Sequence, residues 1–241
     1  MPAYNEAATV RGLASRVLEQ GILLVVVDDG STDSTAQSLE GLPLTLLRNG
    51  RNAGKAVSIH RGIAYALAAG CERIITMDAD GQHLPEDIPR LLDAAERFPG
   101  RIIIGARRRG ASQAPRTRRF ANRFADFWIS WAAGHLVHDS QSGLRVYPSA
   151  LFAQVDTRPH EGAGFVFESE ILIDAAASGL LTASIDIDTI YLPDRRPSHY
   201  RPVADTWAIT RMVARKLLRR GLYPFGLLRA LGLAPPTQRG R

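Results

Sequence analysis

Two short acidic segments hold the side chains best suited to catalysis or ligand binding in this sequence. Residues 28–33 are DDGSTD and residues 78–83 are DADGQH, and each segment directly follows an apolar run. Paired carboxylates in a turn are costly unless they are neutralised, and a hard divalent cation that also binds phosphate oxygens neutralises them well. Together the two segments predict a site for a metal ion and a nucleotide, whereas either one alone could be an ordinary Asp-Gly turn that ends a strand.

The spacing of the glycines excludes two other phosphate-binding motifs. Residues 50–55 superficially resemble a P-loop, but only three residues separate Gly50 from Gly54. Ala56 also replaces the Ser or Thr that would bind magnesium. No Gly-x-Gly-x-x-Gly occurs anywhere in the chain, which removes the fingerprint of dinucleotide-binding folds. A nucleotide in this protein would instead be held through carboxylates and a metal ion.

The elements that must position these segments alternate between strand and helix patterns. Strands are expected at 22–27, 44–47, 73–77 and 102–104, and helices at 6–20, 31–40, 55–69, from Pro85 onward and at 118–133. This alternation predicts an α/β fold with a mostly parallel central sheet flanked by helices. In such a sheet a ligand binds outside the carboxyl ends of the strands, where both acidic segments lie.

The composition of the chain excludes several classes of protein. Its 241 residues are 45% hydrophobic, which is typical of a globular domain and not of a disordered chain. No uncharged apolar run reaches the roughly 18 residues that a transmembrane helix needs. Cys71 is the only cysteine, so a disulfide framework or a cysteine-based zinc site is impossible, and a reducing, cytoplasmic compartment is the simplest expectation.

Several segments, in their order and spacing, resemble the family 2 glycosyltransferases of GT-A fold. They are PAYNE at 2–6, DDGSTD at 28–33, NAGK at 52–55 and DADGQ at 78–82. Three more segments resemble the branch that contains the dolichyl-phosphate and polyprenyl-phosphate sugar synthases. They are GAR at 105–107, RFAN at 119–122 and DSQSGLR at 139–145.

The resemblance implies a GT-A-like domain over residues 1–200, whose first strand is nearly missing because only Met1 precedes Pro2. It also implies the transfer of one sugar from a nucleotide-diphosphate sugar, with inversion at the anomeric carbon. The acceptor would be polyprenyl phosphate or another membrane-associated molecule. The chain lacks the Gln-x-x-Arg-Trp motif of processive polysaccharide synthases, which favours a single transfer.

The same resemblance implies roles for the matching residues. Those expected to bind the nucleotide are Pro2, Tyr4, Glu6, Asp29, Asn52, Lys55 and Asp78. The metal ion, Mg²⁺ or Mn²⁺, would be held by Asp78, Asp80 and Gln82, and Asp80 is also counted among the catalytic residues. The ion would bridge the diphosphate and stabilise the charge that builds on the leaving nucleoside diphosphate.

Basic residues predict where an acceptor phosphate would bind. No acidic residue lies between Arg101 and Arg123, and this cationic stretch suits a phosphate. The residues assigned to the acceptor phosphate are Arg107, Arg119, Arg195, Ser198 and His199. The alternative for the basic cluster is a solvated loop and helix face.

The need for a general base depends on the acceptor. A hydroxyl acceptor needs a base in an inverting displacement, whereas a phosphate acceptor is already ionised and needs none. Asp139 and the Glu168-Ser169-Glu170 segment carry the remaining carboxylates expected near the site. Glu170 is the first candidate for the base, and Asp139 and Arg107 are counted with it as catalytic residues. The alternative for Glu170 is a carboxylate that stabilises a helix N-terminus.

Residues 201–241 are predicted to form a basic amphipathic helical tail. Its apolar stripe consists of Trp207, Met212, Val213, Leu217 and Leu218, which stand among basic residues. Such a helix suits an anionic bilayer interface, which would make the protein peripheral at the inner face of the cell membrane. The alternative is that the stripe packs on the catalytic domain.

Two other functions share part of this pattern. A sugar-phosphate nucleotidyltransferase would use the same metal, carboxylates and nucleotide, but it would release diphosphate from a nucleoside triphosphate. A basic nucleic-acid-binding module is suggested by the isoelectric point of about 10.0. That module leaves both acidic segments unexplained, and the sequence contains no motif that binds RNA or DNA.

Overall fold

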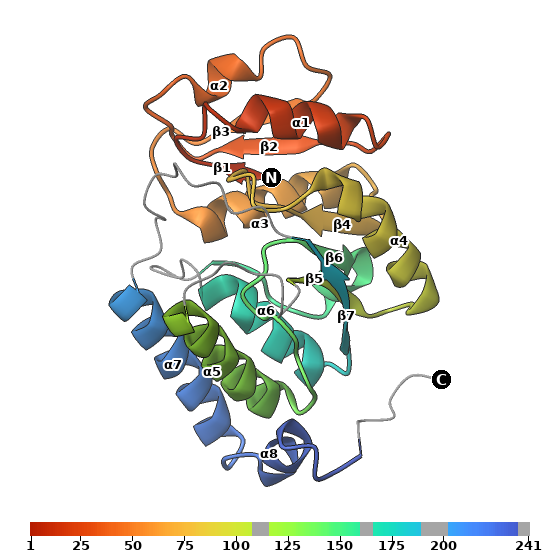
Figure 1. Cartoon of the computed structure of the whole chain (residues 1–241), viewed down its shortest axis with the longest axis vertical. Helices are drawn as coiled ribbons and strands as arrows, with labels where there is room; N and C mark the ends of the chain where they lie inside the picture. The colour runs from red at the N-terminus through yellow and green to blue at the C-terminus, as the bar shows by residue number, and fades with distance from the viewer. Residues whose placement is uncertain (108–115, 160–165, 189–201, 236–241) are drawn as a thin grey trace.

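The computed structural model describes residues 1–107, 116–159, 166–188 and 202–235, without the side chains of residues 116–120 and 202–205. Its strands form a three-stranded and a four-stranded sheet. Figure 1 shows the three-stranded sheet at one end of the molecule and the carboxyl-terminal helices at the other, with the four-stranded sheet between them.

The first sheet is entirely parallel and consists of short strands. They are β1 (Pro2–Ala3), β2 (Val25–Asp28) and β3 (Thr45–Arg48). The helices that follow these strands in turn are α1 (Val10–Leu18), α2 (Thr35–Ser38) and α3 (Lys55–Ala68). In the central strand Val26 and Val27 are buried, as expected for an aliphatic strand that is covered on both faces.

The second sheet contains one strand that runs against the others. Its members are β4 (Arg73–Thr76), β5 (Ile102–Arg107), β6 (Arg145–Pro148) and β7 (Thr182–Ile187). β5 and β7 are parallel, whereas β6 is antiparallel to both β4 and β5. Most strand pairs in the two sheets are therefore parallel, and the predicted α/β fold with a mostly parallel sheet and flanking helices is confirmed.

The remaining helices cover the second sheet and extend below it. They are α4 (Ile88–Arg97) after the 3₁₀ turn η1 (Pro85–Asp87), α5 (Arg116–Ala133), α6 (Val166–Ala177), α7 (Pro202–Arg219) and α8 (Pro224–Ala230), with the 3₁₀ turn η2 (Ser149–Ala153) after β6. Because these helices cover the sheet, Ile102, Ile103 and Ile104 of β5 are completely buried.

Two predicted helices begin later than expected, and the residues before them form hydrogen bonds between loops. The helix predicted over 31–40 begins only at Thr35, and the Ser31 amide before it donates to Asp28 Oδ1 at 3.0 Å. The helix predicted over 6–20 begins only at Val10, and the Glu6 amide before it donates to Thr35 Oγ1 at 2.8 Å. Both segments form loops at the carboxyl edge of the first sheet.

Helix α7 packs against the rest of the protein along part of its predicted apolar stripe. Met212, Val213 and Leu217 are buried in the same core cluster as residues of α5 and α6. This part of the stripe therefore packs on the catalytic domain, which was the alternative to binding at a membrane. Trp207 and Leu218 remain 66% and 68% exposed. Among the described residues, no helix combines the length and apolar character needed to span a bilayer.

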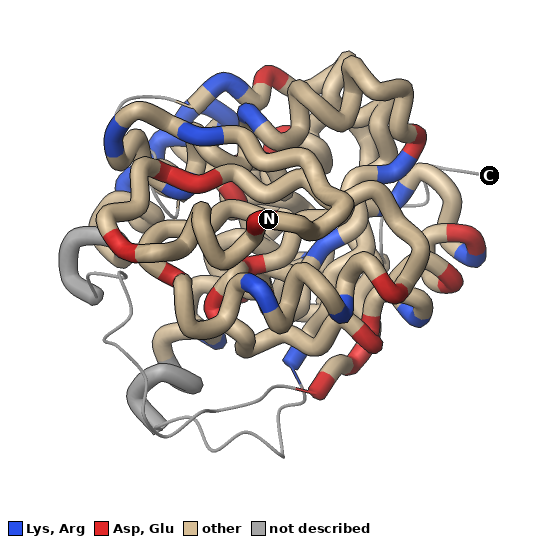
Figure 2. Tube along the Cα trace, turned by 90° about the horizontal axis from the view of Figure 1, so that it is seen from above, with Lys and Arg blue, Asp and Glu red and all other residues tan. Residues whose placement is uncertain are grey.

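Charged residues of both signs are distributed along the described chain. Figure 2 shows Lys and Arg positions as well as Asp and Glu positions on the described chain, with several Lys and Arg positions near one another at the upper left of the view.

Candidate active site

Asp29, after β2, fixes the loop that precedes α3. Its Oδ1 accepts hydrogen bonds from Asn49 Nδ2 at 2.7 Å and from the Ala53 amide at 3.0 Å. Its Oδ2 accepts a hydrogen bond from the Gly54 amide at 2.8 Å. The carboxylate is buried, so these donors take the place of water. Asp29 therefore sets the shape of the loop that carries Asn52, another predicted nucleotide-binding residue.

The turn after Asp29 requires glycine. Gly30 has a φ of +72°, and a Cβ atom there would lie 2.5 Å from the carbonyl carbon of Arg51. Glycine alone permits both this backbone conformation and this close approach. The DDG turn after β2 and the NAGK loop after β3 are therefore in direct contact, as their places at the ends of neighbouring strands predicted.

The PAYNE segment after β1 is tied to the same edge of the sheet. The Asn5 amide donates to Ser31 Oγ at 2.9 Å, and Asn5 Oδ1 accepts a hydrogen bond from the Thr32 amide at 2.8 Å. Thr9 Oγ1 donates to the Ala79 carbonyl at 2.8 Å. These bonds bring residues 2–6, with the predicted Pro2, Tyr4 and Glu6, to the loops that contain the two acidic segments.

Lys55 joins two carboxylates from distant parts of the chain. Its Nζ lies 2.8 Å from Asp78 Oδ1, after β4, and 2.8 Å from Glu168 Oε2, on α6. Burial opposes the charge of Lys55, but the two carboxylates raise its pKa above the ordinary value. Burial likewise opposes ionisation of Asp78, whereas Lys55 and His83 hold the pKa of Asp78 below its ordinary value. Lys55 and Asp78 therefore form a partly buried ion pair at neutral pH.

Asp78 lies directly against the backbone of Gly143. A Cβ atom at position 143 would lie 2.4 Å from Asp78 Oδ2, so a side chain here would displace the carboxylate. Thr76 Oγ1 donates to the Gly143 carbonyl at 3.1 Å and holds the two segments together. The DSQSGLR segment therefore positions the carboxylate at the end of β4.

Asp78, Asp80 and Gln82 share the turn after β4, and their side chains are partly buried. The backbone amide of Gln82 donates to Asp80 Oδ1 at 2.9 Å. Carboxylate and amide oxygens are hard donors that suit Mg²⁺ or Mn²⁺. Within the described ranges, no group of three or more His, Cys, Asp or Glu side chains is placed to hold a metal ion. A divalent ion at this turn would have Asp78 and Asp80 as its charged ligands and would need further oxygens from a ligand such as a diphosphate.

His83, which follows this turn, is buried among charged residues. Burial lowers its pKa below the ordinary value, and Arg107 acts in the same direction, while Asp78 and Asp80 oppose the shift. In the described structure its Nδ1 has no hydrogen-bond partner. His83 therefore interacts electrostatically with both the carboxylates of the turn and the guanidinium of Arg107.

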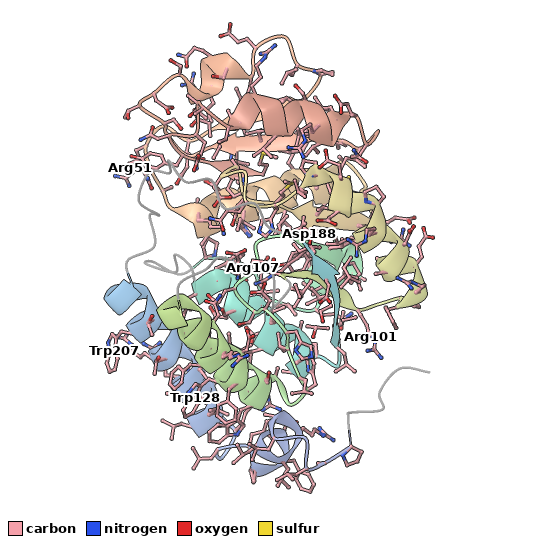
Figure 3. All side chains as sticks on the ribbon, in the orientation of Figure 1. Arg51, Arg101, Arg107, Trp128, Asp188 and Trp207 are labelled. Carbon is pink, nitrogen blue, oxygen red and sulfur yellow. The ribbon has the colours of Figure 1, made fainter. Side chains whose placement is uncertain are left out.

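Arg107 and Asp139, both predicted catalytic residues, bind each other. Arg107 Nε donates to Asp139 Oδ2 at 2.7 Å, its Nη2 donates to Oδ1 at 2.5 Å, and its backbone amide donates to Oδ2 at 2.9 Å. Burial opposes ionisation of Asp139, but Arg107 holds the pKa of Asp139 below its ordinary value. Figure 3 shows Arg107 in the middle of the molecule. In this arrangement Arg107 directs two of its donors to a carboxylate rather than to an acceptor phosphate.

Arg145, a completely buried residue, supports the site from below. Its Nε donates to the Ser142 carbonyl at 2.8 Å, Nη1 donates to the Glu168 carbonyl at 2.7 Å, and Nη2 donates to the Ser140 carbonyl at 2.7 Å. Arg145 therefore joins the loop that carries Gly143 to the first turn of α6. The DSQSGLR motif contains this arginine, but no role was assigned to it from the sequence.

The structure does not bring Glu170 to the cluster. Glu170 Oε1 lies 3.1 Å from Lys216 Nζ on α7, and Lys216 also contacts Asp174 Oδ1 at 2.6 Å. Residues two apart on a helix point about 200° apart, so α6 directs Glu168 toward Lys55 and Glu170 toward α7. Glu168, not the expected Glu170, is the carboxylate of this segment that reaches Asp78 through Lys55.

The remaining predicted acceptor residues are not described. Arg195, Ser198 and His199 lie outside the described residues, and so does the side chain of Arg119, although its backbone belongs to α5. Their assignment to an acceptor phosphate stays a prediction.

Comparison with known proteins identifies relatives over most of the chain. Residues 1–149 match the family described as Glycosyl transferase family 2. The UDP-N-acetylglucosamine–dolichyl-phosphate N-acetylglucosaminyltransferase of Methanococcus voltae is 26% identical over 216 residues, which cover 79% of this chain and 84% of that protein. The polyprenol monophosphomannose synthase of Mycolicibacterium smegmatis is 26% identical over 198 residues, which cover 78% of this chain and 74% of that protein.

A solved structure shares the fold. It is glucosyl-3-phosphoglycerate synthase from Mycobacterium tuberculosis in complex with Mn²⁺, uridine-diphosphate-glucose and phosphoglyceric acid, with a TM-score of 0.64 and 19% identity. The match covers 97% of this chain and 79% of that chain. The chain belongs to glycosyl transferase family 2, resembles the dolichyl-phosphate and polyprenyl-phosphate sugar transferases within it, and is an enzyme of the glycosyltransferase type.

Proposed function

We propose that this protein transfers one sugar, with inversion, from a nucleotide-diphosphate sugar to a polyprenyl phosphate or a similar membrane-associated acceptor. The observation that carries the proposal is the convergence of Lys55, Asp78 and Glu168, with Asp80 beside them, at the carboxyl edge of the strands. The cationic Nζ of Lys55 suits the phosphate oxygens of a diphosphate. The oxygen donors of the neighbouring turn after β4 suit the divalent cation that accompanies it.

Asp78, Asp80 and Gln82 would hold Mg²⁺ or Mn²⁺. The ion would supply stabilisation of the charge on the leaving nucleoside diphosphate. Lys55 and Gly143 fix Asp78 from two sides, which holds this carboxylate in place before any ligand binds. The Mn²⁺ complex of glucosyl-3-phosphoglycerate synthase supports a divalent ion. Tyr4, Glu6, Asp29 and Asn52 lie on the three loops that would surround the nucleotide, and Pro2 lies on β1 directly before the first of these loops.

The partners of the candidate bases favour an acceptor that is already ionised. Each of the three carboxylates considered for proton abstraction is paired with a cation: Asp139 with Arg107, Glu168 with Lys55 and Glu170 with Lys216. Arg107 holds the pKa of Asp139 below its ordinary value, which makes Asp139 a weaker base, and a phosphate acceptor needs no base. The names of the Methanococcus and Mycolicibacterium relatives, which include a dolichyl phosphate and a polyprenol, support the same acceptor class.

The exposed side of α7 and α8 supports a peripheral position at the inner face of the membrane. The large exposed apolar side chains on these helices and the segments beside them are Trp207, Leu218, Leu222, Phe225, Leu228, Leu231 and Leu233. Figure 3 shows Trp207 pointing outward from α7. Exposed arginines on the same helix, Arg211, Arg215 and Arg219, would add about 1 kcal/mol each near an anionic surface.

Transfer to a lipid acceptor tests the main proposal. The purified protein is incubated with Mn²⁺ or Mg²⁺, a panel of labelled nucleotide-diphosphate sugars, and either a polyprenyl phosphate or the matching polyprenol that lacks the phosphate. We expect transfer to the phosphate only. Asp80→Asn should lower this transfer by about 10²-fold or more, because it removes a charged ligand of the ion. Transfer to the polyprenol alone, or activity that resists EDTA in Asp80→Asn, would contradict the proposal.

Binding to vesicles tests the membrane position separately. Phe225→Ser combined with Leu231→Ser should reduce sedimentation with anionic liposomes, while Phe98→Ser, an exposed residue beyond α4, serves as the matched control. Equal binding of the two variants and the unchanged protein would place the membrane contact elsewhere.

A further inference from the structure

Helix α5 carries one acidic residue, and it lies on the buried face of the helix. Asp126 shares this face with Ile129, Ser130 and Ala133, which follow it at helical spacing and are buried with it. None of the motifs that the sequence offered contains Asp126. A carboxylate in such a place is costly unless donors replace the water that it has lost.

The donors come from the turn that begins the DSQSGLR segment. The Asp139 amide donates to Asp126 Oδ2 at 3.1 Å, and the Ser140 amide and hydroxyl donate to Oδ1 at 2.8 and 2.7 Å. Burial raises the pKa of Asp126 above its ordinary value, and the bonds from Ser140 oppose the rise. Two successive backbone N–H groups that point to one acceptor group form a concave turn of the kind that binds anions. Here a side chain of the protein itself occupies the turn.

Asp126 and a second bond hold Asp139 in an unusual backbone conformation. The φ of Asp139 is +52°, in the left-handed region, which costs energy for residues other than glycine unless the surroundings hold it. The Ser142 amide donates to the Asp139 carbonyl at 2.9 Å. Because the backbone of Asp139 is held at both its amide and its carbonyl, the direction of its side chain is set as well.

The side chain of Asp139 in turn holds Arg107. Its carboxylate accepts hydrogen bonds from Nε, from Nη2 and from the backbone amide of Arg107. A guanidinium is planar, so bonds from two of its nitrogens to the two oxygens of one carboxylate fix its plane as well as its place. The orientation of Arg107 therefore depends on Asp139, and through the turn on Asp126.

We propose that Asp126 is a positioning residue that fixes the guanidinium of Arg107 for the acceptor phosphate by holding Asp139 in its left-handed conformation. The inference rests on the proposed function for the identity of the acceptor. The contacts that lead from Asp126 through Asp139 to Arg107 do not depend on which acceptor the enzyme uses.

Other bonds hold the rest of this loop when Asp126 is changed. Arg145 donates to two carbonyls of the loop and is completely buried, and the stretch next to Asp78 follows directly after them. Loss of the Asp126 carboxylate should therefore disturb Asp139 and Arg107 more than the turn predicted to bind the metal ion. This difference separates a positioning role from general support of the fold.

Asp126→Asn tests the proposal, because it preserves the shape of the side chain but replaces one acceptor oxygen by a donor. The new N–H₂ group would face a donor of Asp139 or Ser140, and two donors cannot bind each other. We expect kcat/KM for a polyprenyl phosphate to fall about tenfold, while KM for the nucleotide sugar changes by less than about twofold. The matched control is Ser130→Ala, which removes a bond at 3.0 Å from the Val137 amide to α5 and should leave kcat/KM unchanged.

A double-mutant cycle in urea unfolding measures the same coupling without any substrate. Asp139→Asn weakens the contact with Arg107 and should lower the unfolding midpoint. In the Asp126→Asn background the same substitution should lower the midpoint by less than about half as much, because Asp139 is then no longer directed to Arg107. Additive shifts would overturn the proposal.

Three other results would also overturn it. They are a kcat/KM of Asp126→Asn within about twofold of the unchanged protein, an equal loss of kcat/KM in Ser130→Ala, and an Asp126→Asn protein that does not fold, since Asp126 would then support the whole fold rather than Arg107. If the unchanged protein transfers no sugar, the proposed function fails, and the unfolding cycle alone decides whether Asp126 positions Arg107.

Discussion

Replacing Gly143 by alanine should impair catalysis by moving one carboxylate. The added Cβ would lie 2.4 Å from Asp78 Oδ2, and ordinary contact begins near 3.4 Å, so the carboxylate or the loop must move by about 1 Å. A displacement of that size at a reacting centre costs about 10²-fold in rate, or about 2.7 kcal/mol of transition-state stabilisation. Gly143 does not have a positive φ, so alanine adds no backbone strain.

The assay compares kcat for sugar transfer with Tm for Gly143→Ala and for a control, Gly12→Ala. Apart from the backbone of its own helix and its chain neighbours, no described heavy atom lies within 4 Å of a Cβ atom at Gly12, so the control should retain full activity. We expect Gly143→Ala to lose about 10²-fold in kcat while Tm falls by only a few degrees. Activity within twofold of the unchanged protein would refute the reasoning that Asp78 must stay where Gly143 holds it. A parallel collapse of Tm would show instead that the loop, and not the carboxylate, is what alanine disturbs.

Two further predictions concern α6 and a buried histidine. Glu168→Gln should lower kcat, because it removes one of the two carboxylates that hold Lys55. Glu170→Gln should instead remove a partly exposed ion pair with Lys216, which contributes at most about 1 kcal/mol to the free energy of unfolding. Equal losses of kcat in the two variants would contradict the assignment of Glu168 to the site. Burial lowers the pKa of His135 to about 4, whereas the ordinary value for an unfolded chain is about 6.5. Between these two pH values the unfolded state binds a proton that the folded state does not. The free energy of unfolding should therefore fall by up to about 3 kcal/mol as pH drops from 6.5 toward 4. Urea unfolding across that range should show a shallower pH dependence for His135→Gln, and an unchanged slope would mean that other groups account for the loss.

The sequence predicted the parts of the site that depend on strand ends. DDGSTD and NAGK follow β2 and β3, neighbouring parallel strands whose carboxyl ends meet at one edge, whereas DADGQ follows β4 of the second sheet. The close approach of Gly30, after β2, to Arg51, after β3, confirms that these two loops are in contact. Local pattern and topology were sufficient here because each contact joins segments that follow adjacent strands.

The sequence could not predict which charged groups pair across the fold. Arg107 and Asp139 are 32 residues apart; Arg107 was assigned to the site from the family resemblance, and Asp139 as a remaining carboxylate expected near it. Only the meeting of β5 with the loop before β6 shows that they bind each other. The buried Arg145 was missed for a related reason, since its partners are backbone carbonyls and carbonyls leave no signature in a sequence.

The choice between Glu168 and Glu170 shows how packing decides a role that spacing leaves open. Both residues are carboxylates in the first half of α6, and nothing in the segment FESE distinguishes them. Helical geometry places them on nearly opposite sides, so only one can face the ends of the strands. Lys216, on α7, provides a cation for Glu170 and Asp174, and this fixes the rotation of α6 that leaves Glu168 for Lys55. The tail helix thus contacts the helix that carries Glu168, so a part of the chain outside the family match touches an element of the candidate site.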